Sequence, residues 1–356
     1  MHHMFGRLLN KPFFIRLLHW EYWPFHIVYL PVYIYWFWLS LKSRSFFFFN
    51  TANPTIRNGG FLLESKKEIY DLIPHQYYPA TLFFKTGATL EEVLSLIKKS
   101  ALDYPLICKP DIGMQGKAVR KVHNLQELSD YIFSANFDFL VQEYIAYEHE
   151  AGIFYYRFPD RENGTISGIV YKELLSVTGN GADTIEQLLR RDKRSILQLE
   201  TLRASNSKDF CRVPDNGEKL ILVPYGNHVR GAKFIDASHL IDNELSDSLD
   251  KICKQINGFY FGRLDIRYNN WEELKAGKNI SIIELNGAGS EPTHMYDPKH
   301  SIFFAWKEII RHLDILSKIS RMNRKKYDLP HMSISLGLQM FSANKKHVHL
   351  LDNFKG

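Results

Sequence analysis

The sequence has 356 residues, of which 45% are hydrophobic and 24% charged, as is ordinary for a globular protein with a buried core. The formal net charge of +6 is mild, and basic residues cluster only within residues 190–194 and 321–326, which we expect to be solvated helix faces. No nucleic-acid partner is therefore expected. The three cysteines, Cys108, Cys211 and Cys253, have neither metal-ligand nor disulfide spacing, which favours a reducing, cytoplasmic environment.

The first expected feature in chain order is an aromatic segment within residues 1–49. Residues 23–41 carry no charged side chain, but Pro24 and Pro31 interrupt them, and Tyr and Trp outnumber Leu and Val. Such rings favour the interface of a membrane, and Arg16 and Lys42 flank the segment as an anionic inner leaflet would require. Two interpretations stay open: association with the inner face of the membrane, spanning it or lying on it, or an aromatic hairpin packed on the rest of the chain.

The remainder of the chain alternates between the periods of helices and strands, which predicts a mixed α/β organisation. Ser65 and Thr89 are candidate caps of helices that begin at Lys66 and Leu90. Further helices are expected at residues 125–134, 184–189 (with a continuation through residue 199 left open), 245–256 and 302–319. Strands are expected at residues 104–109, 119–122, 139–144, 153–158, 166–171, 262–268 and 280–285. The last thirty or so residues carry no functional signal.

A strand followed by a glycine loop forms the first motif that could carry chemistry. Lys109 ends the strand, and Gly113 and Gly116 follow in the loop. Glycines let backbone N–H groups approach phosphate oxygens, and the lysine supplies a positive charge. Alone the motif is weak, because a glycine-containing hairpin after Lys-Pro is common.

The second motif lies at residues 139–150. The strand end Gln142, Glu143, Tyr144 and Ile145 could present backbone groups to an adenine edge, and Glu150 could accept hydrogen bonds from ribose hydroxyls. A surface strand with solvated acids is the alternative.

The third motif is the most specific, because polar residues interrupt two apolar strands. Arg263 and Asp265 share one face of their strand, and Glu284 and Asn286 share one face of theirs. If the strands are neighbours, Asp265, Glu284 and Asn286 converge into a set of oxygen ligands that suits Mg²⁺. A buried ion-pair network is the alternative.

Taken in order, these motifs resemble those of the ATP-grasp superfamily, with the D-alanine–D-alanine ligase and cyanophycin synthetase branches nearest. The resemblance covers roughly residues 66–319, and residues 177–189 are similar to a segment of cyanophycin synthetases. It implies an α+β ATP-grasp fold, in which two α/β subdomains clasp the nucleotide, preceded here by the aromatic segment. We therefore expect residues 50–104 to form a linker and an N-terminal α/β part, residues 105–320 the ATP-grasp domain, and residues 321–356 a tail.

The resemblance also implies roles for the individual residues. The nucleotide contacts would be Lys66 (with Lys67 as the alternative), Lys109, Gly113, Gly116, Gln142, Glu143, Tyr144, Ile145 and Glu150. The metal ligands for Mg²⁺, with Mn²⁺ also possible, would be Asp265, Glu284 and Asn286, and the catalytic residues Arg263 and, by a looser match, Arg230.

By the same resemblance, the function would be ATP-dependent ligation of a carboxylate to an amine through an acyl phosphate, with small-molecule or lipid-linked substrates. A phosphotransferase or a non-catalytic nucleotide-binding module are the alternatives. The sequence departs from the family by lacking the usual N-terminal substrate-binding domain, and its segment 286–298 also differs, so substrate identity cannot be transferred. Ser290, Glu291, Thr293 and His294 would line the acceptor side. The oligomeric state is left open.

Overall fold

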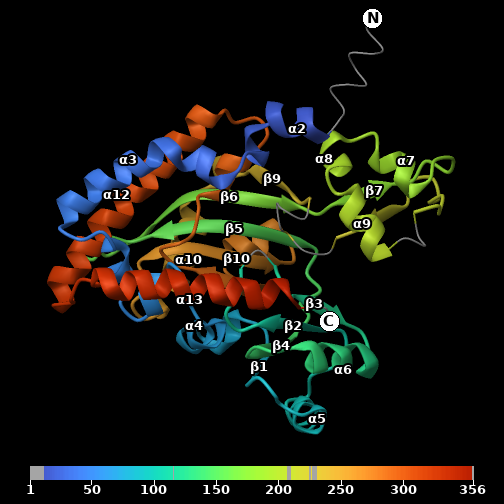
Figure 1. Cartoon of the computed structure of the whole chain (residues 1–356), viewed down its shortest axis with the longest axis horizontal. Helices are drawn as coiled ribbons and strands as arrows, with labels where there is room; N and C mark the ends of the chain where they lie inside the picture. Colours follow the sequence, from blue (N-terminus) through green and yellow to red (C-terminus); the bar gives the residue numbers. More distant parts are fainter. Residues whose placement is uncertain (1–11, 115, 207–209, 224–225, 227–230, 355–356) are drawn as a thin grey trace, which may run out of the picture.

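Two antiparallel sheets, one above the other, frame the molecule in the computed structural model (Figure 1). The structure describes residues 12–114, 116–206, 210–223, 226 and 231–354. Helices and sheets both contribute to its cores, so the α+β class predicted from the sequence is confirmed.

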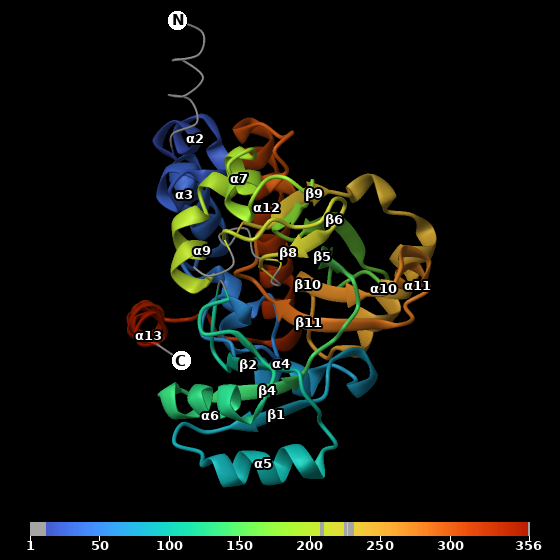
Figure 2. The same cartoon turned by 90° about the vertical axis from the view of Figure 1, so that its right-hand side faces the viewer.

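The smaller sheet has the strand order β1-β4-β2-β3. Its strands are β1 (Thr81–Phe84), β2 (Leu106–Pro110), β3 (Arg120–Val122) and β4 (Phe139–Glu143). Helices α5 (Leu90–Lys99) and α6 (Leu125–Ser134) pack on one face, on the side away from the larger sheet (Figure 2). Because side chains alternate along a strand, Leu106 and Cys108 enter this core while Lys109 faces the other way.

The larger sheet has the strand order β11-β10-β5-β6-β9. Its strands are β5 (His149–Tyr156), β6 (Thr165–Glu173), β9 (Lys233–Asp236), β10 (Phe261–Tyr268) and β11 (Ile280–Asn286). Helix α10 (Asn243–Gln255) packs on its apolar face and α11 (Trp271–Lys275) follows β10. Leu264 and Ile266 of β10 enter this core, so the polar residues between them face the smaller sheet.

The remaining segments connect the two sheets or decorate the larger one. A small unit after β6 consists of β7 (Ser176–Thr178), α7 (Ile185–Leu189), α8 (Lys193–Ile196), α9 (Leu199–Asn206) and β8 (Lys219–Ile221). Helix α4 (Lys66–Leu72) lies between the sheets, and its N-cap is Ser65. Short 3₁₀ helices in the connections include η2 (Phe48–Thr51), η3 (Arg57–Gly60), η4 (His75–Tyr77), η6 (Ser238–Leu240) and η7 (Thr293–Tyr296).

The aromatic N-terminal segment is helical and lies along the domain. It forms α2 (Pro12–Leu18), η1 (Trp20–Tyr22) and α3 (Phe25–Ser43), and α3 runs beside α12 (Ile302–Tyr327) (Figure 1). The indole of Trp306 donates to the carbonyl of Val28 at 2.8 Å, which fixes the two helices together. The inner face of α3 thus packs on the domain, as one of the two interpretations of the sequence expected. Among the described helices, none is both long and apolar enough to cross a membrane.

Helix α13 (Ile334–Asp352) crosses from one sheet to the other along the front of the molecule (Figure 1). Met340 near its start packs in the core that includes α12, whereas Leu351 at its end packs in the core of the smaller sheet. The sequence did not predict this helix, and the helix expected at residues 302–319 also extends further, to Tyr327.

Most other predicted elements are present within a few residues of their expected bounds. Thr89 caps α5 and α6 spans its expected residues. The helix expected at residues 184–189 is present as α7, but it does not continue through residue 199, because it ends after Leu189 and Asp192 caps a new short helix.

Candidate active site

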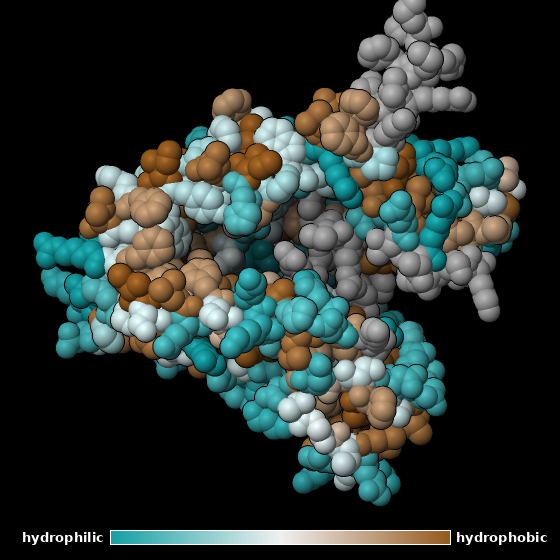
Figure 3. All heavy atoms as spheres, in the orientation of Figure 1, coloured by the Kyte–Doolittle hydropathy of each residue, from teal (hydrophilic) through white to brown (hydrophobic). Residues whose placement is uncertain are grey.

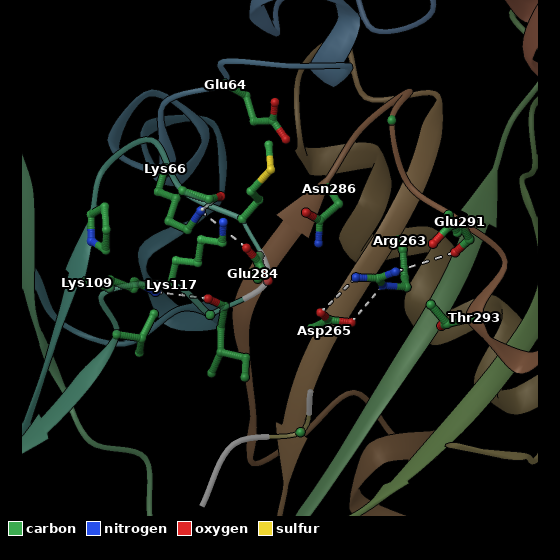
Figure 4. A pocket seen from close by; sticks show the side chains of 18 of the residues that line it. Glu64, Lys66, Lys109, Lys117, Arg263, Asp265, Glu284, Asn286, Glu291 and Thr293 are labelled. Atoms are coloured by element: carbon green, nitrogen blue, oxygen red, sulfur yellow. Dashed lines mark hydrogen bonds and ion pairs between the residues drawn. The ribbon is translucent and has the colours of Figure 1, made fainter. Parts of the chain in front are cut away.

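One cavity of about 680 Å³ lies between the two sheets and is lined by almost every predicted site residue. The predicted residues at its wall are Lys66, Lys109, Gly113, Gly116, Gln142, Glu143, Tyr144, Ile145, Glu150, Arg263, Asp265, Glu284 and Asn286. They come from both sheets, from α4 and from the loop after β2, and Figure 4 shows many of them converging. Arg230 falls outside the described residues, so its place stays a prediction.

Lys109 is a buried amine on the smaller sheet. Its Nζ donates to the hydroxyl of Tyr70 at 2.8 Å, to Oε1 of Gln142 at 2.8 Å and to the carbonyl of Ile283 at 3.2 Å. Burial, together with the nearby charge of Lys66, lowers the pKa of Lys109 to about 7. Neutral groups accept these three hydrogen bonds, so an anion entering the cavity would favour the charged form of the Lys109 amine and pair with it.

Lys66 begins α4 and joins that helix to the loop and to the larger sheet. Its Nζ donates to the carbonyl of Gly113 at 3.1 Å and lies 3.3 Å from Oε1 of Glu284. Burial disfavours the ammonium, but the carboxylates of Glu284 and Glu64 outweigh that cost and raise the pKa of Lys66. Lys66 is therefore a charged side chain at the base of the glycine loop.

Asp265 and Glu284 face each other across β10 and β11. The register pairs Asp265 with Glu284 and Arg263 with Asn286, so the expected convergence of the two strands is present. Arg263 Nε donates to Asp265 Oδ1 at 2.9 Å, and Lys172 Nζ lies 3.2 Å from Oδ2. Burial raises the pKa of the Asp265 carboxyl, but these two cations lower it by more. The net pKa is therefore below its usual value, and the group is ionised.

Lys172 on β6 and Arg267 on β10 are charged residues of the site that sequence reasoning missed. Lys172 Nζ donates to Glu150 Oε1 at 2.8 Å, and Arg267 Nε lies 3.7 Å from Oε2 of the same carboxylate. A side chain at Gly152 would crowd Asp265 and Arg263, so the glycine keeps space for this network. The only signal for Lys172 in the sequence was a lysine at the end of an otherwise apolar strand.

The connection from β4 to β5 carries the chain from one sheet to the other. Glu143 is the last residue of β4, and its N–H donates to the carbonyl of Ala80 at 2.9 Å. Arg267 donates to the carbonyl of Ile145 at 3.0 Å. Tyr144, just before it, lines the cavity between two strands that belong to different sheets. The residues predicted to bind adenine thus lie at the connection between the two sheets.

The acid and amide side chains at the ends of β10 and β11 fit a hard cation bound with an anion. Asn286 Nδ2 is buried and has no hydrogen-bond partner among the described residues, so a donor at this part of the wall is available to a bound anion. The described residues hold no cluster of three or more His, Cys, Asp or Glu that could bind a metal by itself. Two carboxylates and an amide therefore fit Mg²⁺ best where phosphate oxygens supply the remaining ligands.

The expected acceptor side is only partly at the cavity wall. Glu291 and Thr293 line it, whereas His294 does not. The His294 ring is buried behind the wall, 3.1 Å from Oε2 of Glu308, so its expected role as a lining residue is wrong. Ser290 also lies off the wall, and its hydroxyl donates to the carbonyl of Gly287 at 2.6 Å.

No protein-family model matches the chain. Among curated proteins, the glutathione biosynthesis bifunctional protein GshAB of Clostridium perfringens is 29% identical in an alignment of 137 positions that covers 34% of this chain and 18% of that protein. The chain thus matches less than a fifth of the length of that relative.

Three solved ligase structures are similar to parts of the chain. The VanG D-Ala:D-Ser ligase from Enterococcus faecalis has a TM-score of 0.40 and 19% identity over 71% of this chain and 61% of its own. A bifunctional glutathione synthetase from Pasteurella multocida has a TM-score of 0.37 and 13% identity over 71% and 35%. The D-alanine–D-alanine ligase from Bacillus anthracis has a TM-score of 0.42 and 15% identity over 74% and 68%.

These matches are partial and each structure has a TM-score below 0.5, so the resemblance to ATP-grasp ligases stays a prediction from the sequence motifs. Because the superpositions are partial, the roles of individual residues rest on the geometry of this site.

Proposed function

We propose that the protein is an ATP- and Mg²⁺-dependent ligase that joins a carboxylate to an amine through an acyl phosphate. The supporting observation is that two buried lysines, Lys66 on α4 and Lys109 on the smaller sheet, share one cavity with a set of paired acids and cations on the larger sheet. A nucleotide triphosphate carrying a metal ion requires both the lysines and the acids, whereas a structural ion-pair network has no need of a cavity between them.

The smaller sheet and α4 hold the nucleotide in this proposal. Lys109 and Lys66 pair with phosphate oxygens, and the loop with Gly113 and Gly116 covers them. The residues Gln142, Glu143, Tyr144 and Ile145 bind the adenine edge. Glu150, held by Lys172, accepts hydrogen bonds from the ribose.

The larger sheet carries the reacting groups. Asp265, Glu284 and Asn286 would hold Mg²⁺, which neutralises charge on the phosphates when it is bound. Arg263 stabilises the charge that develops as a carboxylate oxygen attacks the γ-phosphorus and ADP leaves. The neutral amine nitrogen then attacks the acyl carbon, the phosphate leaves, and the proton that the nitrogen loses passes to the leaving phosphate as the amide forms.

ADP release with Mg·ATP tests this function, with pooled carboxylates and amines added separately and together. We expect release that needs both substrates and that falls in Glu284→Gln, with Glu272→Gln on α11 as a control that removes an exposed carboxylate elsewhere. Release that needs a hydroxyl compound and no carboxylate would instead indicate a phosphotransferase. Binding of Mg·ATP with no release would indicate the binding module.

We also propose that the outer face of α3 lies on an anionic membrane surface. Leu30, Ile34 and Leu41 on this face are 67%, 76% and 79% exposed, and Figure 3 shows hydrophobic residues along this edge of the molecule. The exposed side chains of Arg16 and Lys42 lie at the two ends of the apolar stretch. An apolar strip between basic ends fits the interface of a bilayer with anionic headgroups.

A further inference from the structure

The N-terminal segment is part of the cavity wall and not merely attached beside it. Trp23, Phe25, Val28 and Tyr29 line the same cavity as the proposed nucleotide site. The segment is fixed to the domain at several points: the Trp20 indole donates to the carbonyl of His300 at 2.8 Å, besides the bond between Trp306 and Val28.

Glu291 presents a carboxylate at the foot of this wall. The hydroxyl of Tyr29 donates to its Oε1, and the hydroxyl of Tyr296 donates to Oε1 at 3.1 Å and to Oε2 at 3.3 Å. Tyr29 stacks on Phe25 with ring centroids 4.1 Å apart, and Tyr296 stacks on Trp20 at 5.5 Å, so both phenols are held in place. The carboxylate is therefore fixed in position by neutral donors.

Glu291 differs in this respect from the acids of the nucleotide half. Glu150 and Asp265 pair with Lys172, and Glu284 pairs with Lys66. In the described part of the chain, no Lys, Arg or His forms an ion pair with the Glu291 carboxylate. A carboxylate has about four lone-pair directions, so the two phenols leave room for a further donor.

The position of Glu291 relative to Arg263 places it on the acceptor side. Arg263 Nη1 lies 3.5 Å from the backbone oxygen of Glu291. In Figure 4, Lys66 and Lys109 lie on one side of Asn286, and Arg263 and Glu291 lie on the other. A carboxylate substrate would be repelled by Glu291 and attracted by Arg263, whereas an ammonium group would be attracted by Glu291.

We propose that Glu291, held by Tyr29 and Tyr296, is the subsite for the ammonium group of the amine substrate. The ring of Phe25, which stacks on Tyr29 and lines the same cavity, receives an apolar group next to that nitrogen. The substrate is then a primary amine with an apolar body, either a hydrophobic amino acid or its derivative, or an amine carried by a lipid. This assignment rests on the proposed ligase function for the identity of the ligand.

Equilibrium binding tests the subsite without turnover. The probe is phenethylamine, titrated by calorimetry into the full chain saturated with a non-hydrolysable Mg·ATP analogue. Loss of a charged hydrogen-bonding partner in Glu291→Gln should weaken binding about 10–100-fold, with nucleotide affinity unchanged. Glu272→Gln, which removes an exposed carboxylate on α11, should bind the probe as the wild type does. Glu291→Asp, which keeps the charge, should retain part of the affinity.

Equal probe affinity in wild type and Glu291→Gln would overturn the subsite, as would equal affinity for phenethylamine and for the uncharged 2-phenylethanol. Because the measurement needs no reaction, a failure of turnover would contradict the ligase function alone. The two sources of amine are separated by activity: stimulation of ADP release by leucinamide identifies a soluble amine. Stimulation only by vesicles containing phosphatidylethanolamine identifies a lipid amine.

Discussion

Asp265 and Glu284 lie directly opposite each other on the antiparallel strands β10 and β11. Two like charges in that relation repel each other, and Arg263, Lys172 and Lys66 compensate them. These cations explain why two neighbouring carboxylates are stable at the floor of a cavity. A metal ion bound there would supply part of the same positive charge.

Replacing Glu284 with Gln should lower the rate of ADP release by about 100-fold or more, because the residue would lose its charge toward the metal and phosphates. The decrease should be smaller at saturating Mg²⁺ if the defect is in metal affinity. A Mg²⁺ titration of the rate for wild type and variant measures both quantities. Unchanged rates at all Mg²⁺ concentrations would show that Glu284 is not a metal ligand.

Nucleotide binding should take up a proton near pH 8. Lys109 has a pKa of about 7 in the free protein, so it is mostly neutral at pH 8, and a bound triphosphate favours its charged form and raises the pKa. Uptake should approach roughly one proton at pH 8 and fall toward zero at pH 6, where Lys109 is already charged. Calorimetry in buffers with different ionisation enthalpies measures this uptake. Lys109→Met should abolish it, and an unchanged uptake in that variant would contradict the assignment.

Glu308 on α12 should contribute to stability above pH 4.5. Burial raises the pKa of its carboxyl, but hydrogen bonds from His294 and Arg311 outweigh burial and lower the pKa to about 2. A depressed folded-state pKa gives stability that is present above the unfolded value of 4.5 and is lost as the pH falls toward 2. Glu308→Gln should therefore cost about 1–3 kcal/mol at pH 7 and progressively less below pH 4. Urea unfolding at several pH values checks this, and a pH-independent difference would contradict it.

Helix α13 should stabilise the smaller sheet through its last turn. Leu351 is buried in the core of that sheet, and Leu338 on the same helix is 62% exposed. Leu351→Ala should cost about 2–5 kcal/mol, and Leu338→Ala, the matched control, less than about 0.5 kcal/mol. Equal effects in thermal unfolding would mean that α13 does not pack as described.

Changing Ile34 and Leu41 to Glu should abolish binding to vesicles of anionic lipid, because charge would replace the apolar strip. Flotation compares this double variant with the wild type and with Leu125→Glu, an exposed leucine on α6. Binding that persists in the double variant would exclude this face. A wild type that dimerises through the face, with the double variant monomeric, would assign it to self-association instead.

The period-two pattern of the strands was the most informative part of the sequence. It placed Arg263 and Asp265 on one face, and the pairing of β10 with β11 brings Asn286 and Glu284 opposite them. Lys109 and Gln142 were likewise found at the cavity, because each lies near the end of an apolar strand, and Glu150 was found by its spacing from Glu143.

Other features depend on contacts between distant parts of the chain, which local patterns do not encode. Lys172 enters the site only because β6 pairs with β5, which pairs with β10. Tyr29 meets Glu291 across 262 positions of sequence. The helix α13 was missed because its apolar residues contact two different cores and so do not form a single stripe.

Trapping with hydroxylamine tests the central claim most directly. Purified protein is incubated with Mg·ATP, a pool of carboxylates and hydroxylamine as the attacking amine, and ADP and hydroxamates are measured together. A ligase that forms an acyl phosphate should release ADP and hydroxamate in equal amounts, and Glu284→Gln should lose both. Release of ADP with a phosphorylated product and no hydroxamate would contradict the account.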